Sequence, residues 1–324
     1  MTTVADGLFQ YGGVPVGGLF STGKAWFVKP STGSDGNTGR TPGRALQTLA
    51  KALEKATANA GDVVYLIAES NTAASTTDYQ SVVLDWNKDG VHLVGIGSTT
   101  MIGQRSRVSN LSTATAIVDG LFIVSADNCI IKNIEVFQGQ GGTNPTGASI
   151  AVSVTGQRNH FVNCQISGIG HSELDDSTSR SLKVSGSENT FSHCYIGLDT
   201  ILRATATAEV EIAATAARNI FEDCIFNSYT SLSTFKAVAA TTLERFVIFK
   251  DCMFIAVQGI TSAVAPTGAI SNTTPNGQIN MLGGGVFGYA DVTTADDSKT
   301  YLLSYSGLAA NRVDQGVGTG TDVA

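Results

Sequence analysis

The chain is poor in charge. Only 15% of its 324 residues are Asp, Glu, Lys or Arg, against about 25% in an average soluble domain. The net charge is −7, and nucleic acid and anionic membranes attract basic surfaces instead. No apolar run approaches the roughly 18 residues of a membrane-spanning helix, and no basic start precedes an apolar stretch as in a signal peptide. We therefore expect a soluble chain with neither nucleic acid nor membrane as a partner.

Cysteine is also scarce, and the familiar catalytic motifs are absent. The five cysteines are too few, and odd in number, for a disulfide framework. None of them forms a C-x-x-C pair, the spacing typical of zinc sites. The sequence also lacks a phosphate-binding loop, a G-x-S-x-G elbow and an H-E-x-x-H pair. These absences predict no metal and no cofactor.

A repeat of about 30 residues is present. The segments RNHFVNCQIS (158–167), ENTFSHCYIG (188–197) and RNIFEDCIFN (218–227) share the pattern Phe-x-x-Cys. Isoleucine replaces the cysteine one copy earlier, at Ile134, which suggests that the thiol is filler in an apolar core. The two repeating columns are Cys164, Cys194, Cys224 and Cys252, and Phe161, Phe191, Phe221 and Phe249.

The spacing of these columns predicts a bend in every copy. Side chains alternate between faces along a strand, so Cys164 and Ile166 share a face whereas Phe161, three residues before Cys164, does not. Because both columns are apolar, both should face the interior, and the chain must turn between them. Asn, Asp and His are the non-glycine residues most enriched in the left-handed region. We predict positive φ at the bend residues Asn133, Asn163, His193, Asp223 and Asp251.

Short strands with period-2 alternation, a one-residue bend and this repeat predict an all-β fold, a parallel β-helix of about six or more coils. Each coil buries its apolar columns only against its neighbours. We expect the β-helix over 26–257, with an amphipathic capping helix at about 43–58. Residues 1–25 are glycine-rich and predict an extended arm. Residues 258–324 predict a strand-containing segment and a tail.

Residues 26–67 resemble the opening of the pectate-lyase-like right-handed β-helix proteins. The resemblance implies a right-handed coil whose open end is covered by the helix at 43–58. That superfamily contains polysaccharide lyases, glycoside hydrolases, phage tailspikes and non-catalytic phage virion proteins. The matching positions are Gly33, Asp35, Asn37, Gly39, Pro42, Thr48, Leu49, Ala52, Gly61, Asp62, Val64 and Leu66.

Four acidic residues are candidates for catalysis. Glu173, Asp175 and Asp176 lie in the segment HSELDDSTSR (171–180), and Asp199 lies in the next loop. The glycosidases of the family use paired carboxylates about 5–9.5 Å apart, and its lyases use carboxylates as calcium ligands with an Arg or Lys base. A solvated loop without function is the simpler interpretation, because charged loop clusters are usually just exposed.

One outward column predicts an interface. Its members become apolar toward the carboxyl end: Glu135, Gln165, Tyr195, Ile225 and Met253. An exposed apolar stripe usually marks an interaction surface. Either packing about a three-fold axis or an arm of the same chain would bury Tyr195, Ile225 and Met253. The apolar residues Leu8, Phe9 and Tyr11 of the amino-terminal arm are further interface candidates.

The missing catalytic constellation and the arms favour a non-enzymatic protein, and the resemblance supplies a phage context. Our first hypothesis is a bacteriophage virion structural protein, a capsid-decoration or spike subunit made in the host cytoplasm and located on the particle surface. It would be a homotrimer anchored to other virion proteins such as the major capsid protein. The alternatives are a polysaccharide lyase or glycoside hydrolase using Glu173, Asp175, Asp176 or Asp199, and a glycan-binding adhesin without turnover.

Overall fold

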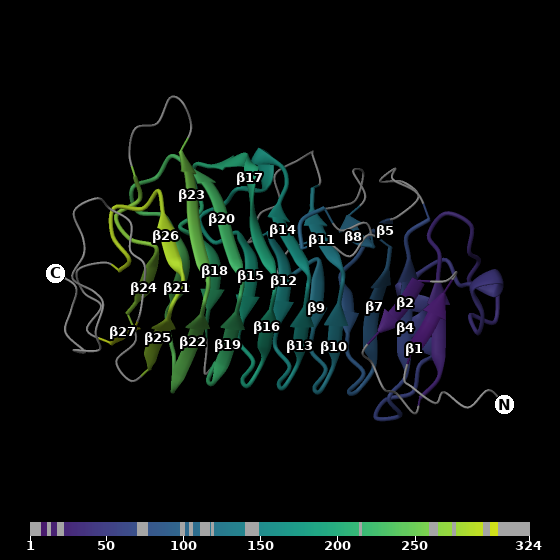
Figure 1. The fold of residues 1–324 in the computed structure, drawn as a ribbon. Helices are drawn as coiled ribbons and strands as arrows, with labels where there is room; N and C mark the ends of the chain where they lie inside the picture. The colour runs from purple at the N-terminus through teal and green to yellow at the C-terminus, as the bar shows by residue number, and fades with distance from the viewer. Residues whose placement is uncertain are drawn as a thin grey trace.

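The protein is an elongated rod wound from stacked coils (Figure 1). The computed structural model describes residues 8–11, 14–17, 23–69, 77–97, 101–103, 106–110, 117, 120–139, 149–213, 216–258, 265–273, 277–293 and 299–303, with the backbone alone for 8–17. Three parallel sheets of ten, eight and seven strands run along the rod. Because successive coils between residues 63 and 272 contribute one strand to each sheet, the prediction of a parallel β-helix of about six or more coils is confirmed. No described helix is long and apolar enough to cross a membrane.

Sheet 1 has ten strands and extends from one end of the rod to the other. Its neighbours pair in parallel and in register, for example Phe161 with Phe191. In order, its strands are β3 (Ala25–Val28), β4 (Val63–Ile67), β7 (His92–Ile96), β10 (Ile130–Lys132), β13 (His160–Val162), β16 (Thr190–Ser192), β19 (Asn219–Glu222), β22 (Phe246–Lys250), β25 (Gln278–Leu282) and β27 (Thr300–Leu303).

Sheets 2 and 3 complete each coil. Sheet 2 contains β5 (Thr77–Gln80), β8 (Arg107–Asn110), β11 (Glu135–Gln138), β14 (Gln165–Ile169), β17 (Tyr195–Arg203), β20 (Ile225–Thr230), β23 (Met253–Gln258) and β26 (Gly285–Phe287). Sheet 3 contains β6 (Leu84–Trp86), β9 (Phe122–Val124), β12 (Ile150–Val154), β15 (Arg180–Val184), β18 (Ala208–Ile212), β21 (Lys236–Ala240) and β24 (Ile270–Asn272). The strands β24 to β27 carry the sheets past residue 257, where the sequence repeat becomes hard to see.

The bend between sheets 1 and 2 is the predicted one. Asn133, Asn163, His193, Asp223 and Asp251 all have φ between 50° and 56°. A second column of residues with positive φ lies where the chain passes from sheet 3 to sheet 1. The conformational preferences of its residue types do not predict it. Its members Asn128, Arg158, Glu188 and Arg218 have φ of 59°, 56°, 61° and 56°. Arg and Glu are not favoured in this conformation, so the stacking of coils, and not local preference, holds them there.

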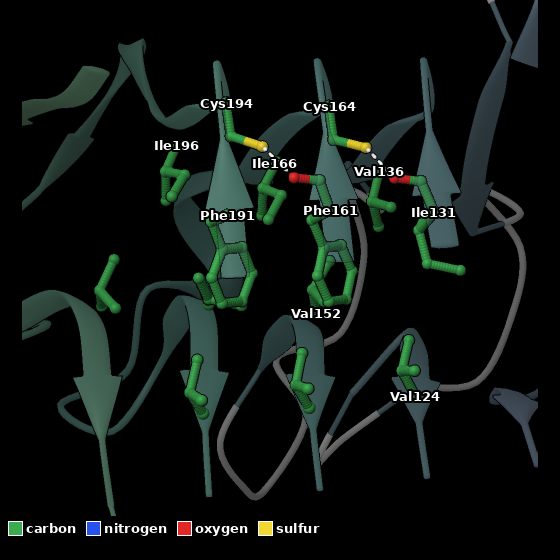
Figure 2. Packing of buried hydrophobic residues seen from close by; sticks show 14 of the residues in the cluster. Val124, Ile131, Val136, Val152, Phe161, Cys164, Ile166, Phe191, Cys194 and Ile196 are labelled. Carbon is green, nitrogen blue, oxygen red and sulfur yellow. Dashed lines mark hydrogen bonds between the residues drawn. The ribbon is translucent and has the colours of Figure 1, made fainter. Parts of the chain in front are cut away.

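The cysteine column is buried and its thiols are free, as predicted. Each sulfur donates a hydrogen bond to a carbonyl oxygen of the preceding coil. The Sγ of Cys164 lies 3.3 Å from the oxygen of Ile131, and the Sγ of Cys194 lies 3.6 Å from that of Phe161 (Figure 2). Burial raises the pKa of the Cys194 and Cys252 thiols. These cysteines are therefore inert core residues.

The phenylalanine column forms a continuous stack beside the cysteines (Figure 2). The ring centroids of Phe161 and Phe191 are 4.7 Å apart, and those of Phe191 and Phe221 are 4.6 Å apart. The interplanar angles are 10° and 7°. Strands pair about 4.8 Å apart, so the strand spacing itself sets the stacking distance of the rings.

A ladder of buried asparagines lines the turn from sheet 3 to sheet 1. The backbone N–H of Asn159 donates to Oδ1 of Asn189 at 2.9 Å, and that of Asn189 donates to Oδ1 of Asn219 at 2.9 Å. The side-chain amide of Asn189 donates in turn to the oxygen of Gly156 at 3.0 Å. Cys129 occupies the same column one coil earlier and donates its N–H to Asn159. The 30-residue spacing of these asparagines was a visible signal of this ladder.

The amino-terminal end of the rod is closed by a short helix. α1 (Leu49–Lys55) is shorter than the predicted span of 43–58, and η1 (Pro42–Arg44) is a separate 3₁₀ turn. The segment between them is held by Asp35, whose Oδ1 accepts the N–H groups of Gln47 and Thr48 at 2.9 and 3.0 Å. The buried residues of the helix join the inner core: Leu49, Ala52 and Leu53.

The ladder and the cysteine column predict losses of stability of different size on substitution within one coil. Cys194→Val keeps a small apolar side chain and should cost less than about 1.5 kcal/mol. Asn189→Val leaves the N–H of Asn159 and the oxygen of Gly156 without their partner, which should cost about 3 kcal/mol. Urea unfolding with an unchanged m-value measures both. Equal losses would contradict a structural role for the ladder.

Candidate functional site

A row of polar side chains crosses the outer face of sheet 2. Arg107 of β8, Glu135 of β11, Gln165 of β14 and Tyr195 of β17 pair in register from strand to strand. The residues that follow them face inward and join the core: Val108, Val136, Ile166 and Ile196. The four polar residues, called the polar row below, therefore point away from the core at intervals of about 4.8 Å. Only Arg107 is partly exposed, whereas Glu135, Gln165 and Tyr195 are 4%, 7% and 8% exposed.

Glu135 is held rigidly in this row. Its Oε2 lies 2.8 Å from Nε of Arg107, and its Oε1 accepts a hydrogen bond from Ser167 at 3.1 Å. The guanidinium of Arg107 also lies over the ring of Phe137, 5.9 Å from its centroid. Arg107 and Ser167 thus orient the carboxylate of Glu135.

The other half of the polar row is also held by neighbouring groups. Gln165 accepts the N–H of Gly103 through Oε1 at 2.6 Å. The hydroxyl of Tyr195 accepts a hydrogen bond from the side-chain amide of Asn227. Burial raises the pKa of the Tyr195 phenol, and the charges of Asp199 and Glu209 add to the effect. Tyr195 therefore stays protonated at neutral pH and can act as a donor.

The same outward column becomes more exposed toward the carboxyl end. Tyr195 is only 8% exposed, whereas Met253 is 37% exposed. Val257 and Phe287, which share the outward parity of Met253 on β23 and β26, are 38% and 39% exposed. Ile225 is intermediate. The exposed apolar part of the predicted interface therefore consists of Met253, Val257 and Phe287. The other predicted interface residues, Leu8, Phe9 and Tyr11, have side chains that are not among those the structure describes.

The predicted acids 173–176 are engaged by different partners. The side chain of Asp175 is only 4% exposed, and its Oδ2 accepts the N–H groups of Ala204 and Thr205 at 2.7 and 2.8 Å. Its Oδ1 lies 3.1 Å from Nε of Arg203. Asp176 accepts hydrogen bonds from its own loop, which hold the pKa of its carboxyl below the usual value.

Glu173 and Asp199 are exposed, on η2 (Ser172–Leu174) and β17. The part of the chain that the structure describes contains no group of three His, Cys, Asp or Glu side chains able to hold a metal ion.

Beneath this loop lies a buried ionic cluster that the sequence does not reveal. The Nη2 of Arg203 donates to the oxygen of Ser179 at 2.9 Å, and Nε of Arg180 lies 3.2 Å from Glu211. Glu209 is fully buried and accepts a hydrogen bond from Ser181. Burial raises the pKa of Glu209. The ion pairs of Arg203 with Asp175 and of Arg180 with Glu211 connect β15, β17, β18 and the loop of Asp175.

The buried and exposed acids should respond differently to neutralisation. Asp175→Asn leaves Arg203 without its counter-charge in the interior, which should cost about 3–5 kcal/mol of unfolding free energy. Glu173→Gln removes an exposed charge and should change stability by less than about 0.5 kcal/mol. Chemical denaturation measures both variants. A stable Asp175→Asn variant would show that the carboxylate is not structural.

Comparison with known proteins identifies the fold. No protein-family model and no curated protein matches the chain. Among solved structures, pectin methylesterase PemA from Erwinia chrysanthemi superposes with a TM-score of 0.56 at 14% identity, covering 90% of this chain and 91% of that one. A rhamnogalacturonan lyase gives 0.53 at 17% identity, covering 90% and 71%. Pectate lyase Pel9A gives 0.52 at 12% identity, covering 90% and 78%.

The chain has the pectate-lyase-like right-handed parallel β-helix fold. The resemblance of residues 26–67 is thereby confirmed. The three solved structures named above are carbohydrate-active enzymes. At identities of 12–17%, the likeness establishes the fold alone.

Proposed function

We propose that this β-helix is a polysaccharide-degrading enzyme, a lyase or a glycoside hydrolase, whose site lies at the polar row of sheet 2. Because Glu135, Gln165 and Tyr195 are only 4%, 7% and 8% exposed, substrate reaches them only when the residues that cover them move aside. The polar row carries this proposal. Arginine, glutamate, glutamine and tyrosine side chains stand in register on a rigid sheet, and together they offer the donors and acceptors that sugar hydroxyl and carboxyl groups require. The fold neighbours named for pectin, pectate and rhamnogalacturonan support the same choice.

Within this proposal Glu135 is the general acid–base group. Arg107 and Ser167 orient its carboxylate, which keeps the productive geometry without movement at the moment of reaction. Gln165 and the protonated Tyr195 bind the neighbouring sugar units. Asp199, exposed on the same strand as Tyr195, is the second carboxylate of the proposed site. The acids of 173–176 have no part in it.

Incubation with pectin, pectate, rhamnogalacturonan and capsular polysaccharides tests the proposal. New reducing ends report hydrolysis, and new unsaturated ends report elimination. Glu135→Gln should lower the rate by about 10²-fold or more, because it removes the proton-transfer group, and Tyr195→Phe should weaken binding. Glu173→Gln is the matched control and should retain full activity. Absence of cleavage across the panel, or full activity of Glu135→Gln, would refute this assignment.

A second candidate function is a non-enzymatic virion subunit, the first hypothesis from sequence. The observation that favours it is the exposed apolar group of Met253, Val257 and Phe287, since such groups mark interfaces. A homotrimer would bury this group, and a glycan-binding adhesin could be built in the same way. Light scattering should then give a trimeric mass that Met253→Ser with Phe287→Ser reduces to that of a monomer. A wild-type monomer at every concentration would contradict this alternative.

A further inference from the structure

The first coils carry an apolar patch on the outside of the rod. Val63 and Tyr65 of β4 and Val94 of β7 alternate with residues of the inner core, so they face outward. They are nevertheless only 4%, 6% and 3% exposed. Phe27 and Ile96 pack against them, and the rings of Phe27 and Tyr65 stack with centroids 5.3 Å apart. These five residues are called the outer patch below.

Neighbouring strands of the same sheet do not account for this burial. Further along the outer face of sheet 1, residues of similar size remain partly exposed: Ile130, Val162, Ile220 and Ile248. Val162 occupies the same register row as Val94, two strands away. The helix α1 does not cover the outer patch, because its buried side chains belong to the inner core. An additional layer of the chain must therefore lie over Val63, Tyr65 and Val94.

The amino-terminal hairpin has the matching chemistry. β1 (Leu8–Tyr11) and β2 (Val14–Gly17) pair antiparallel, with Phe9 opposite Val16 and Tyr11 opposite Val14. Because strand residues alternate between faces, this register places Phe9, Tyr11, Val14 and Val16 on one face of the hairpin. The opposite face carries Leu8, Gln10, Pro15 and Gly17. A lone two-stranded hairpin is marginally stable in water, so an entirely apolar face requires a surface to pack on.

We propose that the β1–β2 hairpin docks in cis on the outer patch through its face of Phe9, Tyr11, Val14 and Val16. The seven residues 18–24 that join it to β3 span at most about 25 Å, whereas β4 and β7 lie only about 5 and 10 Å from β3. So short a tether gives a high effective concentration. Figure 1 places the hairpin at the same end of the rod as β3 and β4.

This docking gives the amino-terminal arm a partner within its own chain. The three expected interface residues of the arm then lie on two faces of the hairpin. Phe9 and Tyr11 belong to the docking face, and Leu8 belongs to the opposite face. The proposal does not depend on the polar row or on any enzymatic activity. It makes the hairpin a strap over the first coils, at the end of the rod where the sheets would otherwise offer bare apolar surface to solvent or to other molecules.

Thiol labelling tests the proposal, because all five native cysteines are buried. Val94→Cys reports on the outer patch, and Val162→Cys, in the same row but outside it, is the matched control. Deletion of residues 1–17 should speed labelling of Val94→Cys by about tenfold or more, the factor that corresponds to about 1.4 kcal/mol of docking. Labelling of Val162→Cys should not change. Phe9→Ser with Val16→Ser should reproduce the effect of the deletion, and Gln10→Ser should not.

Other labelling results would overturn the proposal. If Val94→Cys in the full chain reacts as fast as Val162→Cys, or if neither the deletion nor the docking-face substitutions accelerate it, the hairpin does not cover the patch. If protection grows with protein concentration together with a dimeric mass, the hairpin docks in trans and the cis proposal is overturned. If the deletion unfolds the chain, the native cysteines will react as well. The proposal is then decided by comparing the double variant Phe9→Ser with Val16→Ser against the control Gln10→Ser.

Discussion

In-register hydrogen bonding between successive coils is the constraint on which the rest of this structure depends. It repeats side chains of the same kind at the strand spacing of about 4.8 Å. Phenylalanine rings can therefore stack at 4.6–5.0 Å, and each asparagine of the ladder can reach the backbone of the coil before it. The same constraint forces Arg158, Glu188 and Arg218 into a left-handed conformation, where their mutual ion pairs partly offset the strain.

The constraint also shapes what the outer surface can do. A strand face presents one side chain per coil, so any outward row is a rigid line of groups at fixed spacing. Where that row contains Glu135, Gln165 and Tyr195 its side chains are buried and hydrogen-bonded, and where it reaches Met253 it is 37% exposed and apolar. The buried charges serve the fold instead: Arg203 pairs with Asp175 and Arg180 pairs with Glu211, and these ion pairs brace the loops.

Much of the fold was predictable because the coil repeats in the sequence. The spacing of Cys164 and Phe161 required a corner, and the Asn, Asp and His column showed where it lies. The asparagines at 159, 189 and 219 were equally periodic, and their burial follows from the same argument. The candidate site was less predictable. Clustering in the sequence drew attention to Glu173, Asp175 and Asp176. Glu135 has no acidic neighbour in its own segment and meets Arg107 only through the adjacent coil.

The sequence by itself determined the parallel β-helix, its bends and its inert cysteines, because each is a property of one coil that recurs every 28 to 30 residues. Only the tertiary structure decided which acids are buried, which outward residues form a polar row and which outer face is covered. The physical reason is that these depend on contacts between segments far apart in the chain. Asp175 contacts residues 203–206, and Glu135 contacts Arg107. The burial of Val94 requires a covering layer that cannot be predicted from the residues next to it in the sequence.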